Sequence, residues 1–360
     1  MFLSQDCYPT GKSWRHIRRL ITPPFTAHRI SQPSVIKTIS MSSQKVFDAL
    51  DECKQSKIIV DFCDDNIDGS RRFTINASTL SKSYTIDVIS KIAFGLNDTD
   101  AFETDSKLME MAEEFMANCD GPINWLMYMF PFLGRPIELI NNYLTSGRMI
   151  DMLSRHLKKI IKEYQLESLN DDDDQHNEDV KQNVIDYFLY QKKVSNLTEN
   201  EAIGNLLVIL LAGYETTACC LSFTLFNLAK NPQIQDRLRD KLRSLYNNEN
   251  DQMDNLEEIK CEYLDRCIYE SLRLYPPVID YVIREISDDL DEVKLSNGLK
   301  IPKHVAIQFQ FGICIMNPLF GRIHMHLIPI EKIYQFRVHR LGILHFLLSV
   351  LDNEVVLETI

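Results

Sequence analysis

The sequence contains little glycine and tryptophan, no C-x-x-C pair and no excess of basic residues. Its 12 glycines and 2 tryptophans in 360 residues, beside abundant Leu, Ile, Lys and Glu, favour a mainly helical chain. Nine cysteines, an odd number without paired spacing, indicate reduced thiols facing the cytosol and argue against a disulfide framework. With 39 basic and 51 acidic residues the net charge is −12, so no nucleic-acid partner is expected. The acidic run 171–174 lacks ligand spacing and predicts a solvated loop, not a metal site.

The N-terminus carries no basic-then-apolar signal pattern and no spanning stretch, so we expect no targeting segment or membrane anchor in this chain. One internal segment, 202–229, contains a single charged residue, Glu215, and is long enough to cross a bilayer. We prefer a buried core helix, because an ionisable group at bilayer depth is costly. The membrane alternative predicts that this segment, expressed alone, inserts into membranes.

Helical periodicity extends along most of the chain. Thr198 and Glu201 form a capping-box pattern at the start of the central helix, and Asn231–Pro232 ends it. Beyond Pro277 we expect short strands around an Asn297–Gly298 turn. The predicted helices are 14–20, 85–94, 105–117, 139–164, 183–192, 198–231, 232–245 and 259–275, and the predicted strands are 281–286, 299–301 and 305–313. The pattern predicts one large helical domain with a small β element.

Two motifs precede or lie within the central helix. Trp14 and Arg18 share a helix face and can offer an indole N–H and a guanidinium to an anion, although a solvated basic helix explains that pair equally well alone. Within 212–217 (Ala-Gly-Tyr-Glu-Thr-Thr), the Glu215 carboxylate beside the Thr216 hydroxyl is costly to bury unless it has a function. Gly213 lets a bulky ligand approach the backbone. A satisfied polar cluster in the core is the alternative.

Two further motifs follow the central helix. Glu270 and Arg273, at i and i+3, form an ion pair that contributes little if exposed and orients the following segment if buried. That segment is Tyr275-Pro-Pro277, which stops the helix. Arg284 comes next, on the first expected strand.

The order and spacing of these motifs resemble the cytochrome P-450 family. Ala-Gly-Tyr-Glu-Thr-Thr, then Glu-x-x-Arg and Tyr-Pro-Pro, are similar to the family's pattern, and the stretch 263–277 matches it almost throughout. Trp14-x-x-x-Arg18 resembles the family's haem-propionate pair. The likeness extends from Trp14 to about Pro318. The general character of the sequence resembles that of animal microsomal members, which oxidise drugs, toxins or steroids. The resemblance implies a mainly α cytochrome P-450 fold with a small β element, a truncated N-terminus and a non-native C-terminal tail.

The resemblance also implies roles for individual residues. Glu215 and Thr216 would relay protons to iron-bound dioxygen. The haem would be bound by the residues Trp14, Arg18 and Arg284 at its propionates and by Ala212 and Gly213 at the central helix, while Glu270 and Arg273 would hold the core. The implied partners are a small apolar substrate above the haem, dioxygen and a flavoprotein NADPH reductase. The intact parent, meaning the protein with both missing family segments present, would be associated with the endoplasmic reticulum membrane at its cytosolic face.

The chain departs from the family at both ends. The membrane anchor and first helices that precede the tryptophan motif are missing. The family's F-x-x-G-x-R-x-C-x-G loop, whose cysteine thiolate binds the haem iron, is also missing. The last cysteine, Cys314, lies in Phe-Gly-Ile-Cys without the arginine or the spacing, so we expect a packed core cysteine and no metal ligand.

We hypothesise a change of reading frame near Phe320, which would explain the C-terminal departure. Codons built from the third base of one codon and the first two of the next allow W-x-x-P-x-A-F-x-P-x-R and then F-x-x-G-Q-R-x-C-x-G, which are the family's missing segments. The pairs that allow them are Phe320–Gly321, Ile323–His324, Met325–His326, His326–Leu327, Ile328–Pro329 and Ile330–Glu331, then Leu348–Ser349, Leu351–Asp352, Asp352–Asn353, Asn353–Glu354, Val355–Val356 and Leu357–Glu358.

The sequence therefore predicts a haem-dependent monooxygenase by family that is inactive as translated. Residues 1–320 would form a partial cytochrome P-450 domain and residues 321–360 an out-of-frame tail. Other classes stay open: a non-catalytic protein that binds apolar ligands, which requires a stable fold without haem, a pseudogene product, and a membrane protein that spans at 202–229.

Overall fold

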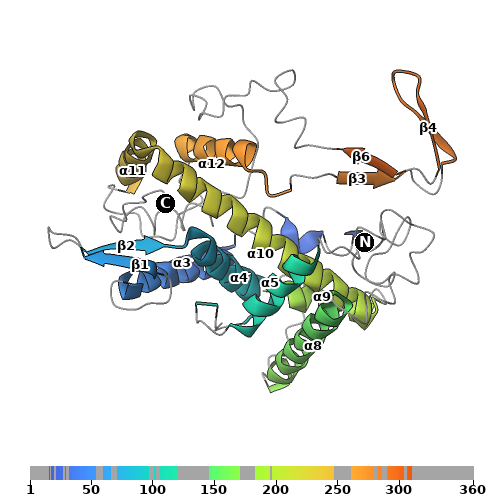
Figure 1. Cartoon of the computed structure of the whole chain (residues 1–360). Coiled ribbons are helices and arrows are strands. Elements are labelled where there is room, and N and C mark those ends of the chain that lie inside the picture. The colour runs from blue at the N-terminus through green and yellow to red at the C-terminus, as the bar shows by residue number, and fades with distance from the viewer. Residues whose placement is uncertain are drawn as a thin grey trace. The chain divides into compact units, whose positions relative to one another are not determined.

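The computed structural model divides the chain into two compact units. Figure 1 shows the helices and strands of the described residues. The structure describes residues 16, 18–19, 22–26, 29, 32–53, 60–65, 71–96, 101–102, 106–119, 146–170, 183–194, 197–246, 261–278, 282–285, 290–303 and 306–309. The first unit comprises Met1–Pro9, Ile17–Lys45 and Lys82–Glu215, and the second comprises Thr10–His16, Val46–Ser81 and Thr216–Ile360. Trp14, Cys314 and the predicted tail 321–360 lie outside the described residues.

The described part of the chain is mainly helical, as predicted. The helices are η1 (Pro23–Phe25), α3 (Pro33–Cys53), α4 (Ala77–Phe94), α5 (Lys107–Cys119), α8 (Ser146–Asn170), α9 (Val184–Val194), α10 (Glu199–Lys230), α11 (Pro232–Tyr246) and α12 (Glu262–Leu274). From α5 onward the predicted helices recur with shifted ends. The sequence analysis missed α3 and placed the start of α4 too late.

Local side-chain chemistry explains where α4 and α10 begin and end. At α10, Thr198 N donates to Oε2 of Glu201 at 2.9 Å and Glu201 N donates to Oγ1 of Thr198 at 3.3 Å, which confirms the capping box. At α4, Oδ1 of Asn76 accepts hydrogen bonds from the N–H groups of Ser78 and Thr79. Gly95, with φ of 68°, ends α4 in the left-handed conformation that glycine adopts without strain.

The strands form three small antiparallel pairs. In the C-terminal region β3 (Val282–Glu285) pairs with β6 (Ala306–Phe309), and β4 (Glu292–Lys294) pairs with β5 (Lys300–Pro302) across the predicted turn, where Gly298 has φ of 86°. A further pair, β1 (Val60–Asp65) with β2 (Arg71–Ile75), was not predicted. The small β element is therefore confirmed, and it is larger than expected.

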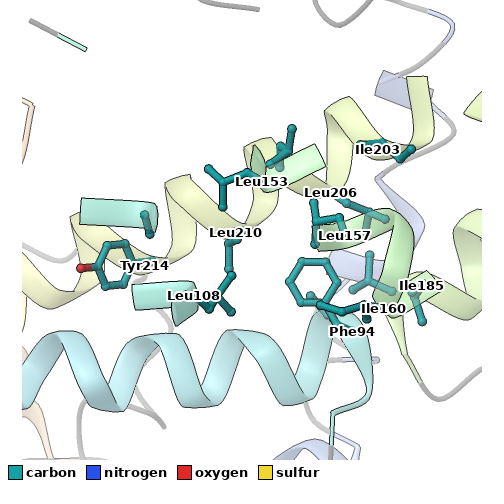
Figure 2. Close-up of a cluster of buried hydrophobic side chains, with 14 of the residues drawn as sticks. Phe94, Leu108, Leu153, Leu157, Ile160, Ile185, Ile203, Leu206, Leu210 and Tyr214 are labelled. Atoms are coloured by element: carbon teal, nitrogen blue, oxygen red, sulfur yellow. The ribbon is translucent and has the colours of Figure 1, made fainter. Parts of the chain in front are cut away.

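The core of the first unit is an apolar cluster that α10 crosses (Figure 2). Leu206, Leu210 and Tyr214 of α10 are at most 1% exposed. They pack in one cluster with side chains of α4, α5, α8 and α9, among them Phe94, Leu108, Leu153, Leu157 and Ile185. Burial of this apolar surface fixes the N-terminal half of α10.

The C-terminal half of α10 is also buried, within the second unit. Ala218, Leu221, Leu225 and Leu228 are at most 2% exposed. By length and composition α10 is the one described helix that could cross a membrane. Buried side chains along both of its halves favour the core interpretation over the membrane alternative.

Candidate functional site

The residues of the 212–217 motif lie in the middle of α10 and differ sharply in exposure. Tyr214 is fully buried, whereas Ala212 is exposed and Thr216 is partly exposed. Because residues four apart share a helix face, Ala212 and Thr216 present one face of α10 that is more open than the Tyr214 side. This more open face of α10 therefore carries a methyl group and a hydroxyl.

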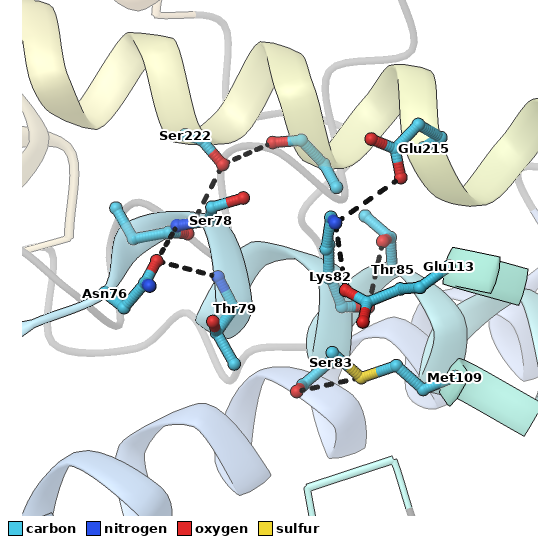
Figure 3. Close-up of polar contacts among 12 residues, drawn as sticks. Asn76, Ser78, Thr79, Lys82, Ser83, Thr85, Met109, Glu113, Glu215 and Ser222 are labelled. Atoms are coloured by element: carbon cyan, nitrogen blue, oxygen red, sulfur yellow. Dashed lines mark hydrogen bonds and ion pairs between the residues drawn. The ribbon is translucent and has the colours of Figure 1, made fainter. Parts of the chain in front are cut away.

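Glu215 lies beside a lysine of α4 (Figure 3). Its Oε2 is 3.9 Å from Nζ of Lys82, and the same Nζ donates a hydrogen bond of 2.9 Å to Oε1 of Glu113 on α5. Oε2 of Glu215 is buried and has no hydrogen-bond partner among the described residues. One cation therefore serves two carboxylates. Sequence reasoning missed Lys82 and Glu113, because a single lysine and a single glutamate on amphipathic helices carry no signal of a shared site.

Tyr214 adds a second buried polar atom to this region. Its hydroxyl has no hydrogen-bond partner within the described part of the chain. Burial, followed by the charges of Glu113 and Glu215, raises the pKa of Tyr214, so the phenol is protonated at neutral pH. The tyrosine therefore contributes a neutral O–H group close to two carboxylates.

Gly213 lies against α4. A Cβ built at Gly213 would be 3.1 Å from Cδ1 of Ile89, closer than ordinary van der Waals contact. The approach of α10 to α4 thus gives the glycine a packing role. The predicted approach of a ligand to Gly213 stays a prediction.

Glu270 and Arg273 form an ion pair on α12. Nε and Nη2 of Arg273 donate to Oε2 and Oε1 of Glu270, both at 2.7 Å. The Glu270 side chain is fully buried, and 26% of the Arg273 side chain is exposed. The hydrogen bonds to Glu270 raise the pKa of Arg273, as expected for a bidentate ionic contact.

The helix end after this pair is fixed by an aromatic stack. Tyr275 stacks on Phe223 of α10, with ring centroids 4.3 Å apart and 3° between the planes. Asn227 Nδ2 of α10 also donates to Oγ of Ser271 at 3.0 Å. These contacts hold the end of α12, and the segment Pro276–Pro277 behind it, on α10. The predicted orienting role of the ion pair remains to be tested.

Of the residues predicted to bind propionates, Arg18 belongs to the first unit and Arg284 to the second. Arg18 is exposed on helical backbone. Arg284 lies on β3, opposite Ile307 of β6. Trp14 is outside the described residues, so the propionate assignment stays a prediction.

The structure describes the side chains of four free cysteines, Cys219, Cys220, Cys261 and Cys267. Burial raises the pKa of Cys220 to about 11 and that of Cys267 to about 12, and it also raises the pKa of Cys261. These three side chains are therefore packed thiols in the protein without a metal. The absence of the haem-binding cysteine loop stays a prediction.

Comparison with known proteins gives a family match. The family model of cytochrome P450 matches residues 7–320. The chain is 27% identical to cytochrome P450 3A11 of Mus musculus, over 86% of this chain and 55% of that protein. It is 26% identical to cytochrome P450 3A5 of Homo sapiens, over 81% and 53%, and 25% identical to probable cytochrome P450 6a23 of Drosophila melanogaster, over 78% and 52%. The chain spans about half the length of these curated relatives.

Proposed function

Because the chain belongs to the cytochrome P450 family, we propose that its intact parent is a haem monooxygenase that inserts one oxygen atom of dioxygen into a small apolar substrate. The single observation that carries this proposal is the acid–alcohol pair Glu215–Thr216, next to an open face of the apolar helix α10. We place the parent at the cytosolic face of the endoplasmic reticulum membrane, with a flavoprotein NADPH reductase as electron donor. The microsomal character of its relatives supports this placement.

The proposed roles rest on the resemblance to the family and on the chemistry of the side chains. The Thr216 hydroxyl and the Glu215 carboxylate are the groups that hold and pass protons. Ala212, one turn before Thr216, leaves space for the flat face of a haem, and Gly213 brings α10 close to α4. Glu270 and Arg273 hold the core around the end of α12. Arg18 and Arg284, with Trp14, are assigned to anionic propionates because two of the three carry a permanent positive charge.

Haem in this family supplies dioxygen activation only when a cysteine thiolate binds its iron. We propose that residues 321–360 are an out-of-frame tail, that residues 1–320 are a partial P450 domain, and that the chain is inactive as translated. The family match supports this boundary, because it ends at residue 320, where the shifted frame begins to spell family residues.

Two measurements test the proposal. The transcript across residues 315–360 should contain an open shifted frame through the predicted cysteine codon, and a stop codon before it would refute the frame shift. The reduced, carbon-monoxide-bound spectrum separates activity from family membership. We expect no thiolate-type Soret band from the 360-residue chain and such a band after the frame is restored. A sulfur-ligated haem in the 360-residue chain would contradict the proposed inactivity.

A further inference from the structure

We propose that Lys82 is a positioning residue for Glu215: it holds the Glu215 carboxylate on the side of α10 that faces α4 and α5, in competition with Glu113. Lys82 belongs to α4, Glu113 to α5 and Glu215 to α10, so three helices distant in sequence converge on one ammonium group (Figure 3). The inference rests on the proposed function, in which Glu215 holds a proton.

The distances show which of the two carboxylates accepts the hydrogen bond of Lys82. The 2.9 Å distance from Lys82 Nζ to Glu113 is a hydrogen bond, whereas the 3.9 Å distance to Glu215 is an ion pair without one. Closing the second distance requires a shift of roughly 1 Å by a flexible side chain with three N–H donors. Lys82 can therefore serve both acceptors in turn.

The two carboxylates need the lysine to different extents. The Glu113 side chain is 45% exposed, so water can solvate it when the lysine leaves. Oε2 of Glu215 is buried and has no other described hydrogen-bond donor. An unsolvated carboxylate oxygen gains much more from a nearby cation than a hydrated one. The position of Glu215 should therefore depend on Lys82, while that of Glu113 should not.

Among the described residues, the groups near this carboxylate come from α4, α5 and α10. Lys82 approaches from α4, Glu113 from α5, and the protonated Tyr214 hydroxyl from α10 itself. With one cation and two carboxylates, the cluster has a formal charge of −1. Loss of Lys82 would leave Glu215 facing a second carboxylate, which favours rotation of the Glu215 side chain toward solvent.

The first experiment maps the contact in the full 360-residue chain. A water-soluble carbodiimide joins a lysine to a carboxylate that touches it, as an amide with loss of water. We expect Lys82–Glu113 and Lys82–Glu215 cross-linked peptides by mass spectrometry, and a higher yield of the second in Glu113→Gln. Absence of the Lys82–Glu215 peptide from both proteins would overturn the proposal.

The second experiment separates charge from packing. We expect Lys82→Met to lower the urea midpoint of unfolding, because the buried oxygen of Glu215 then loses its nearby cation. Lys82→Arg should restore most of the loss. The matched control is Lys159→Met, because Lys159 pairs with Glu163 on α8 with both side chains more than half exposed. A loss no larger than that of Lys159→Met, or no rescue by arginine, would contradict the proposal.

These measurements do not involve haem. Failure of the positioning proposal would leave the carbon-monoxide spectrum of the frame-restored chain unaffected, and failure of the proposed monooxygenase function would leave the cross-links and the unfolding midpoints unaffected. If Lys82→Met does not fold, the cross-links of the wild-type chain and of Glu113→Gln still decide the question.

Discussion

Removal of Arg273 should destabilise the protein more than removal of its partner Glu270. The Glu270 side chain is fully buried, whereas 26% of the Arg273 side chain is exposed. In Arg273→Met the buried carboxylate loses its cation and two hydrogen bonds, which costs about 3–5 kcal/mol for a broken buried pair. In Glu270→Gln the arginine keeps its access to water and one acceptor, so the loss should be about 1.5–3 kcal/mol, as for a hydrogen bond to a charged group.

The same helix offers a control for this comparison. Arg266 and Glu262 form an i,i+4 pair on α12 at 2.6 Å, with the Glu262 side chain 64% exposed. Arg266→Met should therefore cost about 0–1 kcal/mol. The measurement is urea unfolding followed by far-ultraviolet circular dichroism, and the double variant Arg273→Met with Glu270→Gln gives the coupling energy. Equal losses for Arg273→Met and Arg266→Met would refute the conclusion that burial makes this pair important.

Three other substitutions test separate features of the fold by the same unfolding measurement. Asn76→Ala removes the acceptor of two N–H groups at the start of α4 and should cost about 1 kcal/mol, whereas Asn76→Asp should keep the cap. Asp87→Ala removes the carboxylate that Lys91 contacts at 2.7 Å, and because Lys91 is only 8% exposed the loss of stability should be about 3–5 kcal/mol. The control is Asp151→Ala, which removes one partner of a pair whose two side chains are both 67% exposed. It should cost at most about 1 kcal/mol. Tyr214→Phe removes a buried hydroxyl that has no described partner, so stability should stay constant or rise, and a loss above about 1 kcal/mol would indicate a partner such as bound water.

The helices that the sequence predicts well are those with chemical end signals. Thr198 with Glu201 begins α10, Pro232 separates α10 from α11, and Pro276 follows α12. In contrast, α3 was missed because its buried side includes serines. Ser42 and Ser43 are at most 2% exposed and interrupt the apolar spacing of Ile36, Ile39, Val46 and Leu50. Ser43 Oγ donates to the backbone of Ile39 at 3.0 Å, which makes burial of the hydroxyl tolerable.

The late predicted start of α4 has a similar cause. Its first two turns, 77–84, consist mainly of small polar residues, which do not form an apolar stripe. The structure begins the helix at Ala77 because Asn76 caps it. The strands β1 and β2 were missed since they carry several charged residues within short segments.

The sequence could predict which residues of the candidate site share a face of α10. It could not predict the contacts that α10 makes with other helices. Spacing alone shows that Ala212 and Thr216 share a face, because that relation belongs to a single helix. The contacts of Glu215 with Lys82, and of Gly213 with Ile89, depend on how α4 packs on α10. Nothing in the local sequence around position 82 or 89 encodes that packing.

The energetic argument for a functional Glu215 applies to one of its oxygens. Sequence reasoning treats the whole carboxylate as buried and therefore costly, yet 31% of the side chain is exposed. The cost is concentrated at Oε2, which is buried and 3.9 Å from a lysine that hydrogen-bonds elsewhere. A carboxylate selected for stability alone would face solvent fully or complete that hydrogen bond. The buried oxygen without a hydrogen bond, beside a lysine that bonds to Glu113, is therefore the structural observation that supports the proposed function of Glu215.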